Sequence, residues 1–284
     1  MPVPDHDPAV STVTDALAWT VVGVFVAAAA LDAVDRRDDA RLVASGAWML
    51  FGGFWLAVFP IFAFEMRSFI EGGLALIAVP ACVYTGYLLH SGRLSLLVLS
   101  RAVAFMGVLY LPVETVPIVR RVLIESVAGQ THAVATALGY DVTLTTGPTY
   151  GYRSRFIFET NGAEYSTYII TACTGIGSMA IFGGLIAAVD ARIGRKLRAF
   201  ALAVGIIWTL NIARNVFIAV AFGRQWFQHE PLVAIATGVV GYQESFMTSF
   251  FIADRVISQT LAVVALVGIT WVVVQRLPEL LAPL

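Results

Sequence analysis

Runs of about twenty mostly apolar residues recur along this chain and constrain its fold more than any other feature. A helix of about 20 apolar residues is what crosses the hydrocarbon core of a bilayer. Only 13% of the residues are charged, against roughly a quarter in soluble domains, and 58% are hydrophobic. A soluble globule of this length has too little interior to bury that much apolar surface. The sequence therefore predicts an all-α polytopic membrane protein, with residues 1–284 forming a single domain.

Seven segments have the length and apolarity of a spanning helix: 16–34, 44–64, 72–90, 94–113, 168–189, 199–222 and 256–275. A further apolar stretch, 231–252, contains Gly238, Gly241, Gln243 and Glu244. This stretch is either an eighth span or a re-entrant or interfacial segment. The sequence predicts seven transmembrane helices and leaves the eighth open.

Basic residues gather at one set of segment ends: Arg36, Arg37, Arg41, Arg93, Arg192, Arg195, Lys196, Arg198 and Arg276. Cytoplasmic loops carry the excess of Lys and Arg in membrane proteins, so we expect these ends to be cytoplasmic. The N-terminus and the loops after the second, fourth and sixth spans are then extracytoplasmic. An eighth full span would reverse the sides expected for Arg255 and Arg276, so the charge distribution favours seven.

The longest polar stretch, 114–167, falls in an extracytoplasmic loop and predicts a small cap inserted into the membrane domain. Apolar residues at helical spacing over 113–138 predict a helix lying in the membrane interface. Alternating residues over 140–166, interrupted by Gly147-Pro148, predict two short strands around a turn.

Several classes of function are disfavoured by the composition. The net charge is −1 and no large basic cluster occurs, which argues against a nucleic-acid partner. The two cysteines and four scattered histidines show no metal-ligand spacing, so we expect neither a metal nor a cofactor. No repeat of spans or matched pair of broken helices is visible, which lowers the expectation of a transporter.

Cys173 is a candidate nucleophile near the outer end of the fifth predicted span. At ~1.5 Å per residue it lies about 8 Å inside that helix, whose positive end would favour a thiolate. The small residues around it, Gly175 among them, would let a peptide approach closely. The alternative is an inert buried cysteine among small packing residues, which is the interpretation we give to Cys82.

Two arginines are expected at a depth similar to that of Cys173. Arg214 lies inside the sixth span with Asn211 and Asn215 nearby in sequence, and an unpaired arginine in hydrocarbon costs at least ~2.5–3.5 kcal/mol. Arg255 follows Asp254 at the outer start of the last span. Each arginine also has a structural interpretation. Arg214 would bond backbone carbonyls of neighbouring helices, and Arg255 would anchor its helix end at the membrane interface. The two arginines and the Cys173 thiol come from three different segments and are expected at a similar depth. This coincidence favours a functional site over three independent structural roles.

These residues also carry a resemblance to a known family. The segments Thr-Ala-Cys-Thr-Gly-Ile-Gly-Ser at 171–178, Asn-Ile-Ala-Arg-Asn at 211–215 and Ala-Asp-Arg at 253–255 resemble the three signature sites of the exosortase/archaeosortase family. The resemblance covers most of the chain and is strongest to the archaeal branch. Bacterial exosortases are expected to carry His where this chain has Arg255.

The resemblance implies a membrane-embedded cysteine transpeptidase whose site faces the extracytoplasmic side of the cell membrane. Its partners would be surface proteins, such as the S-layer glycoprotein, that end in a Pro-Gly-Phe motif, a hydrophobic helix and a basic tail. The tail would be removed and the new C-terminus joined to a membrane lipid. Cys173, Arg214 and Arg255 would be catalytic, and Asn211, Asn215, Gly175 and Asp254 would support them or bind substrate.

Two other functions stay open from the sequence. An integral-membrane cysteine protease would use the same residues and release a free carboxylate. A non-enzymatic transporter or assembly scaffold would not depend on the thiol, although the buried charges lie near one face rather than along a path across the membrane. The group that carries the proton is also open, with Asp254, Glu244, tyrosines of the cap and water as candidates.

Overall fold

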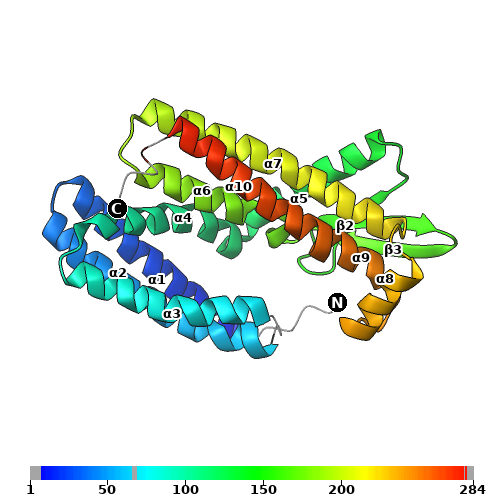
Figure 1. Ribbon diagram of the computed structural model, residues 1–284, viewed down its shortest axis with the longest axis horizontal. Helices are drawn as coiled ribbons and strands as arrows, with labels where there is room; N and C mark the ends of the chain where they lie inside the picture. The colour runs from blue at the N-terminus through cyan, green and yellow to red at the C-terminus, as the bar shows by residue number, and fades with distance from the viewer. Residues whose placement is uncertain (1–7, 66–68, 278, 280–284) are drawn as a thin grey trace. The chain divides into compact units, whose positions relative to one another are not determined.

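The computed structural model describes residues 8–65, 69–277 and 279. Helices joined by short connections make up most of it, with one small antiparallel sheet in the second half of the chain (Figure 1). The chain divides into two compact units, of which the first comprises Met1–Thr115, Ala180–Leu197 and Leu277–Leu284. The second comprises Val116–Met179 and Arg198–Arg276.

Four long helices dominate the first unit: α1 (Pro8–Ala33), α2 (Arg37–Pro60), α3 (Phe69–His90) and α4 (Leu97–Thr115). Helix α1 packs against α2 and α4, and α2 packs against α3. Phe25 is fully buried at the centre, with its ring edge-on to Trp48 at 5.3 Å. The Trp48 indole donates to Ser100 Oγ at 2.9 Å, so the polar atom of this aromatic residue is satisfied inside the helix bundle.

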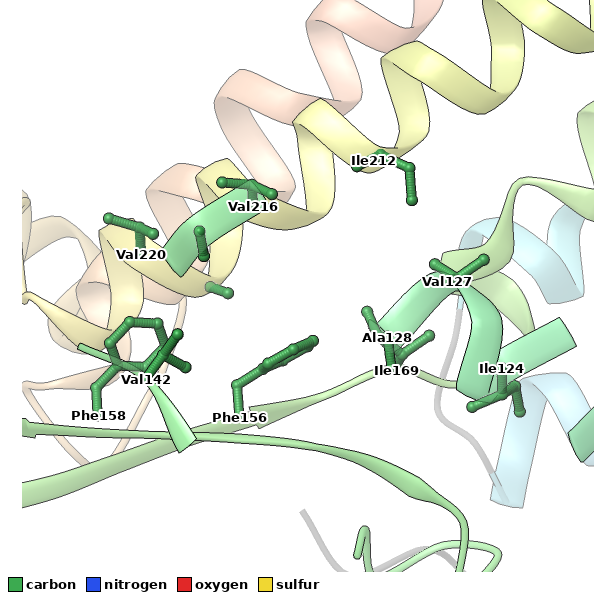
Figure 2. Packing of buried hydrophobic residues seen from close by; sticks show 12 residues of the cluster. Ile124, Val127, Ala128, Val142, Phe156, Phe158, Ile169, Ile212, Val216 and Val220 are labelled. Atoms are coloured by element: carbon green, nitrogen blue, oxygen red, sulfur yellow. The ribbon is translucent and has the colours of Figure 1, made fainter. Parts of the chain in front are cut away.

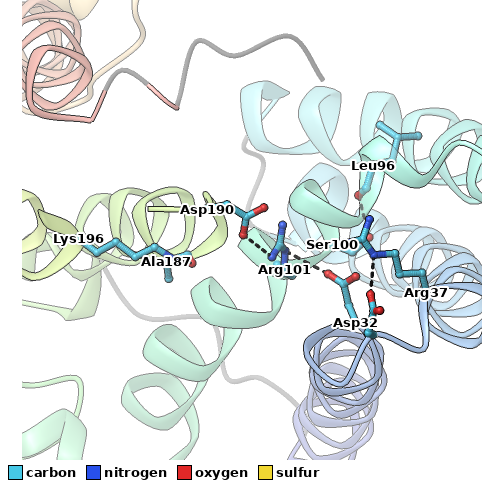
Figure 3. Close-up of polar contacts among 9 residues, drawn as sticks. Asp32, Arg37, Leu96, Ser100, Arg101, Ala187, Asp190 and Lys196 are labelled. Atoms are coloured by element: carbon cyan, nitrogen blue, oxygen red, sulfur yellow. Dashed lines mark hydrogen bonds and ion pairs between the residues drawn. The ribbon is translucent and has the colours of Figure 1, made fainter. Parts of the chain in front are cut away.

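An ion cluster ties several helix ends of the first unit together (Figure 3). Arg101, near the start of α4, lies 3.4 Å from Asp32 of α1 and 3.1 Å from Asp190, which follows the helix α6 (Ile176–Ala188). In the same unit, Arg41 of α2 donates a hydrogen bond to the Leu89 carbonyl near the end of α3. These contacts join ends that the arginine distribution assigns to one side of the membrane. The pairing of Arg101 was not predicted from the sequence.

The second unit begins with α5 (Pro117–Ala137), followed by the strands β1 (Thr143–Thr146), β2 (Arg153–Thr160) and β3 (Ala163–Tyr168). They form an antiparallel sheet in the order β1-β2-β3. The helix and the hairpin around Gly147-Pro148 were predicted, but the expectation of only two strands was wrong. Asn161 (φ 54°) and Gly162 (φ 78°) form the tight turn that adds β3.

The core of the second unit lies between α5, the sheet and α7 (Ile193–Gly223) (Figure 2). Phe156 and Phe158 of β2 are both 1% exposed and face Val216 and its neighbours on α7. A Cβ atom at Gly223 would lie 2.3 Å from the Phe158 ring, so only glycine permits this approach of helix to strand. The side of α5 that carries Ile124, Val127 and Ala128 is therefore covered by protein, whereas Ile118 and Val122 are exposed.

The remaining elements are α6 (Ile176–Ala188), α8 (Glu230–Ala234), η4 (Ile235–Val239), α9 (Met247–Phe250), η5 (Phe251–Ser258) and α10 (Gln259–Arg276), with short turns η1 (Ile61–Glu65), η2 (Leu94–Leu96) and η3 (Thr171–Thr174). The stretch 231–252 is not one helix. It breaks after η4, where Gly241 has a φ of +86°, and resumes at α9. An unbroken eighth span is thereby excluded.

Six helices in the described part of the chain are long and apolar enough to cross a membrane: Val13–Ala33, Arg37–Phe64, Gly72–His90, Leu94–Thr115, Ile193–Gly223 and Met247–Arg276. They correspond to six of the seven predicted spans. The fifth prediction, 168–189, is not confirmed as a full span because α6 has only 13 residues. At 1.5 Å per residue that is about 20 Å, short of the ~30 Å hydrocarbon core.

Candidate active site

Cys173 lies in the tight turn η3 between β3 and α6. Thr174 Oγ1 bonds the Thr171 carbonyl at 2.6 Å and the Cys173 amide bonds the Ile170 carbonyl at 2.9 Å, which closes the turn. The expectation that Cys173 sits about 8 Å inside a helix was wrong, because α6 starts only at Ile176. The thiol residue therefore precedes the helix N-terminus and lies outside the six candidate spans.

Two asparagines of α7 hold this turn from the same side. The side-chain amides of Asn211 and Asn215 both donate to the Cys173 carbonyl oxygen, at 2.8 and 2.9 Å. Residues four apart share one face of a helix, so the pair acts as a double donor to a single acceptor. Asn215 is only 4% exposed. These two bonds fix the backbone of the candidate nucleophile against α7.

Gly175 makes the close approach of η3 to α7 possible. Its φ is +78°, and a Cβ atom there would lie 3.2 Å from Asn211 Cγ. Side chains other than hydrogen are strained in this backbone region, and this one would also press on a residue that bonds Cys173. Glycine at this position therefore serves the geometry of the turn.

We expect Gly175→Ala to lower the free energy of unfolding by about 1–2 kcal/mol, because alanine is strained at positive φ, and to lower activity by displacing Asn211. Thermal unfolding of the purified protein measures the first effect, and substrate processing the second. Gly177→Ala is the matched control, since a Cβ atom at Gly177 meets nothing within 4 Å. Equal stability of the two variants would contradict the role given to Gly175.

Arg214, one turn from Asn211, points to a different partner. Its Nη2 lies 2.6 Å from Asp254 Oδ1, and Arg255 Nε lies 3.6 Å from Asp254 Oδ2. Asp254 is buried, whereas the Arg255 side chain is 58% exposed. Each carboxylate oxygen thus faces one guanidinium group, and Asp254 bridges the two arginines that the sequence singled out.

The π-helical segment η5 places Asp254 toward α7. It covers Phe251–Ser258 and leads directly into α10. Segments with the wider π-helical turn occur frequently at functional sites, because they change the direction of side chains within an otherwise regular helix. Gln259, at the start of α10, lies 3.3 Å from both Nη1 and the backbone oxygen of Arg255 and so steadies this exposed arginine.

The charges around Cys173 act on its thiol in opposite directions. Burial raises the pKa of the Cys173 thiol above its usual value, whereas a backbone hydrogen bond at Ile170 and the Arg214 guanidinium lower it. Asp254 adds to the rise and Arg255 opposes it. Arg214 and Arg255 therefore favour the thiolate form of Cys173 against the effect of burial.

The remaining sequence candidates make no hydrogen bond or ion pair with this cluster within the described residues. Gln243 and Glu244 are exposed in the loop between η4 and α9. Cys82 is buried in α3 of the first unit, where its Cβ packs near Gly52. Among the described residues, no group of three or more His, Cys, Asp or Glu side chains is arranged to hold a metal ion.

An apolar groove of about 450 Å³ begins beside the Cys173 turn and continues between α7 and α10. Ala172 and Gly175, on either side of Cys173 in the chain, line it, as do Asn211 and Arg214. Sequence reasoning missed this groove, because its walls come from residues about 50 positions apart.

The family model described as transmembrane exosortase matches residues 13–252, which include Cys173 and Arg214. The chain belongs to the transmembrane exosortase family. This exosortase-family protein is 48% identical over 278 residues to Archaeosortase A of Haloferax volcanii, covering 94% of this chain and 90% of the relative. Archaeosortase A of Natronomonas pharaonis is also 48% identical, over 272 residues that cover 94% of this chain and 86% of that protein. No solved structure matches this exosortase-family chain. The family suggested by the three sequence motifs is confirmed, and the chain is a multi-pass membrane protein.

Proposed function

We propose that this protein is a membrane-embedded cysteine transpeptidase that removes the C-terminal sorting tail of surface proteins, such as an S-layer glycoprotein, and joins the new C-terminus to a membrane lipid. The observation that carries the proposal is the joint placement of one thiol residue and two guanidinium groups. Cys173 is bound to α7 through Asn211 and Asn215, and Asp254 links Arg214 of that helix to Arg255. Its two relatives named Archaeosortase A support the same assignment.

In the first step, the Cys173 thiolate attacks the carbonyl carbon of the scissile peptide bond. A C–S bond forms, and the carbonyl oxygen takes the negative charge that Arg214 stabilises. Collapse of this intermediate breaks the C–N bond, and the amine leaves with the tail after accepting a proton. The products are a thioester on Cys173 and a free tail that begins with an amino group.

In the second step, an amine or hydroxyl group of a membrane lipid attacks the thioester carbonyl. A C–N or C–O bond forms, the C–S bond breaks, and the thiolate is regenerated while the nucleophile loses its proton. Arginine stays protonated in proteins, so neither Arg214 nor Arg255 is the base. Asp254 faces both guanidinium groups, and we assign it to positioning Arg214 rather than to carrying this proton.

The site is proposed to face the extracytoplasmic side. The basic ends of the predicted spans are expected in the cytoplasm, and Cys173 follows the 114–167 cap on the opposite side of that assignment. The Arg101 cluster joins two of the ends assigned to the cytoplasm. Secreted substrates would meet the thiol after export.

The mass of the processed C-terminus tests the proposal directly. We expect a surface-protein substrate, coexpressed with the wild-type enzyme, to lose its tail and gain the mass of a lipid. A free carboxylate as the sole product would identify a protease instead. Unprocessed substrate in the presence of folded, membrane-inserted enzyme would favour the scaffold or transporter.

A further inference from the structure

The groove beside Cys173 has two chemically different parts. Along α7 and α10 it is lined by apolar side chains, among them Ile207, Leu210, Phe217, Leu261, Leu266 and Ile269. Its polar lining comes from Asn211 and Arg214 of α7 and from Ser258 and Gln259 at the junction of η5 and α10. A ligand that fits both parts has an apolar chain and a polar or anionic head.

Ser258 is a polar residue built into this groove. It is 4% exposed and lines the cavity at the end of η5. Hydroxyl side chains in this segment normally return to the helix backbone, as Thr260 does to the Val256 carbonyl at 2.7 Å. Within the described ranges, the Ser258 hydroxyl makes no such bond. Because its hydroxyl makes no protein hydrogen bond in this part of the structure and the residue lines the cavity, Ser258 is available to bond a ligand head.

The size of the groove separates two kinds of occupant. A spanning helix about 30 Å long and 10 Å wide occupies roughly 2,400 Å³. The groove encloses about 450 Å³, in the range of sites for single small ligands. A whole spanning helix is thus several times larger than the groove, and a single lipid chain is the better match in size. The cationic end, with Arg214 in the wall and Arg255 beside Asp254, complements an anionic headgroup.

We propose that the groove between α7 and α10 is the acceptor site, which binds one chain of an anionic membrane lipid with its headgroup at the Arg214 end. The inference deepens the proposed transpeptidase function and rests on it. The groove would bring the amine or hydroxyl of the headgroup to the thioester, because Ala172 and Gly175 flank Cys173 and line the same cavity. Lipid transfer would then depend on residues that touch neither the peptide nor the thiol.

Alanines that line the groove allow it to be filled. Ala213 on α7 and Ala262 on α10 both line the cavity and are exposed. Larger side chains at these positions would therefore extend into the groove without disturbing the packing of buried residues. We expect Ala262→Phe to lower the lipid-linked fraction of product at least about tenfold, because displacing two buried methylenes of the chain costs ~1.6 kcal/mol. The missing product should appear as a free carboxylate or as enzyme thioester. Ala213→Leu should act in the same direction from the opposite wall.

Labelling locates the lipid independently of turnover. Full-length enzyme in phosphatidylcholine vesicles is irradiated with phosphatidylglycerol that carries a diazirine in one chain, and the labelled peptides are mapped by mass spectrometry. We expect labels within 207–217 and 258–269, reduced in Ala262→Phe and unchanged in the control Val263→Phe. Val263 is 62% exposed on α10 and does not line the groove. A diazirine phosphatidylcholine should label these segments less than the anionic lipid does.

The outcomes separate this inference from the proposed function. If Ala262→Phe and Ala213→Leu transfer lipid and take up label as the wild type does, the acceptor site is elsewhere, while Cys173-dependent cleavage stands. Equal labelling by the two headgroups would show an adventitious lipid and overturn the proposal, as would labelling by a diazirine on the sorting tail in place of the lipid. Tail removal that persists in Cys173→Ala refutes the transpeptidase, whatever the lipid labelling shows.

Discussion

Replacement of Cys173 by alanine is expected to leave the sorting tail on the substrate, with activity lower by on the order of 10³-fold or more. Alanine has no nucleophile that could replace the thiol. The turn itself should persist, because the bonds from Asn211 and Asn215 go to the backbone carbonyl of residue 173. Immunoblotting of the substrate and the mass of its C-terminus measure the loss.

Cys82→Ala is the matched control for this experiment. Cys82 is the second cysteine of the chain and is buried in α3 of the first unit. We expect that variant to process substrate as the wild type does, apart from a small loss of stability. Cys173→Ser should be nearly as inactive as the alanine variant, since a hydroxyl without an adjacent base is a poor nucleophile. Tail removal by Cys173→Ala would make the thiol a packing residue.

The second large effect is expected from Arg214→Lys, which keeps the charge and removes the planar fork. The lysine ammonium would still favour the thiolate, but it cannot donate to Asp254 and to a developing oxyanion with the geometry of a guanidinium. Loss of one preorganised oxyanion donor costs about 10²–10³ in kcat. We therefore expect kcat to fall by that factor with little change in KM.

Two further variants are needed to interpret the result for Arg214→Lys. Arg121→Lys changes an exposed arginine of α5 that pairs with Glu125 at 3.1 Å, and it should have no effect on processing. Asp254→Asn keeps the Arg214 side chain but removes its charged partner, so the guanidinium should lose its fixed position and activity should fall. Near wild-type kcat in Arg214→Lys would reduce the Arg214–Asp254 pair to a structural ion pair.

Hydropathy predicted the long helices well because apolar length is the quantity that a bilayer selects. It failed at residues 168–175, where apolar side chains such as Ile169 and Ile170 extend the signal beyond the true helix. There β3 ends at Tyr168, Ile169 and Ile170 form an extended connection, and η3 follows before α6 begins. Apolarity does not reveal whether a backbone amide bonds within a helix or across a sheet. The Asn161-Gly162 turn carried a signal for β3 that the interpretation of 140–166 as two strands did not use.

The candidate residues were recognised because polar groups are costly in apolar segments, yet their contacts were less predictable. The spacing of Asn211 and Asn215 already places both on one helix face, and that signal was available. The bridge from Asp254 to both arginines was not, because it depends on the π-helical path of η5 and on the approach of two distant segments. The catalytic roles of all these residues stay predictions.

The path of η5 divides the Met247–Arg276 segment into two helical frames. A π-helical turn is equivalent to an inserted residue, so side chains before and after it follow different angular series. Asp254 lies within the wide turn, whereas the groove positions Leu261, Ala265 and Ile269 follow the ordinary spacing of α10. A design that treats Met247–Arg276 as one regular α-helix would therefore place the Asp254 carboxylate and the groove residues at the wrong angle to each other. Any redesign of the groove has to treat η5 and α10 as two helical segments with different side-chain spacing.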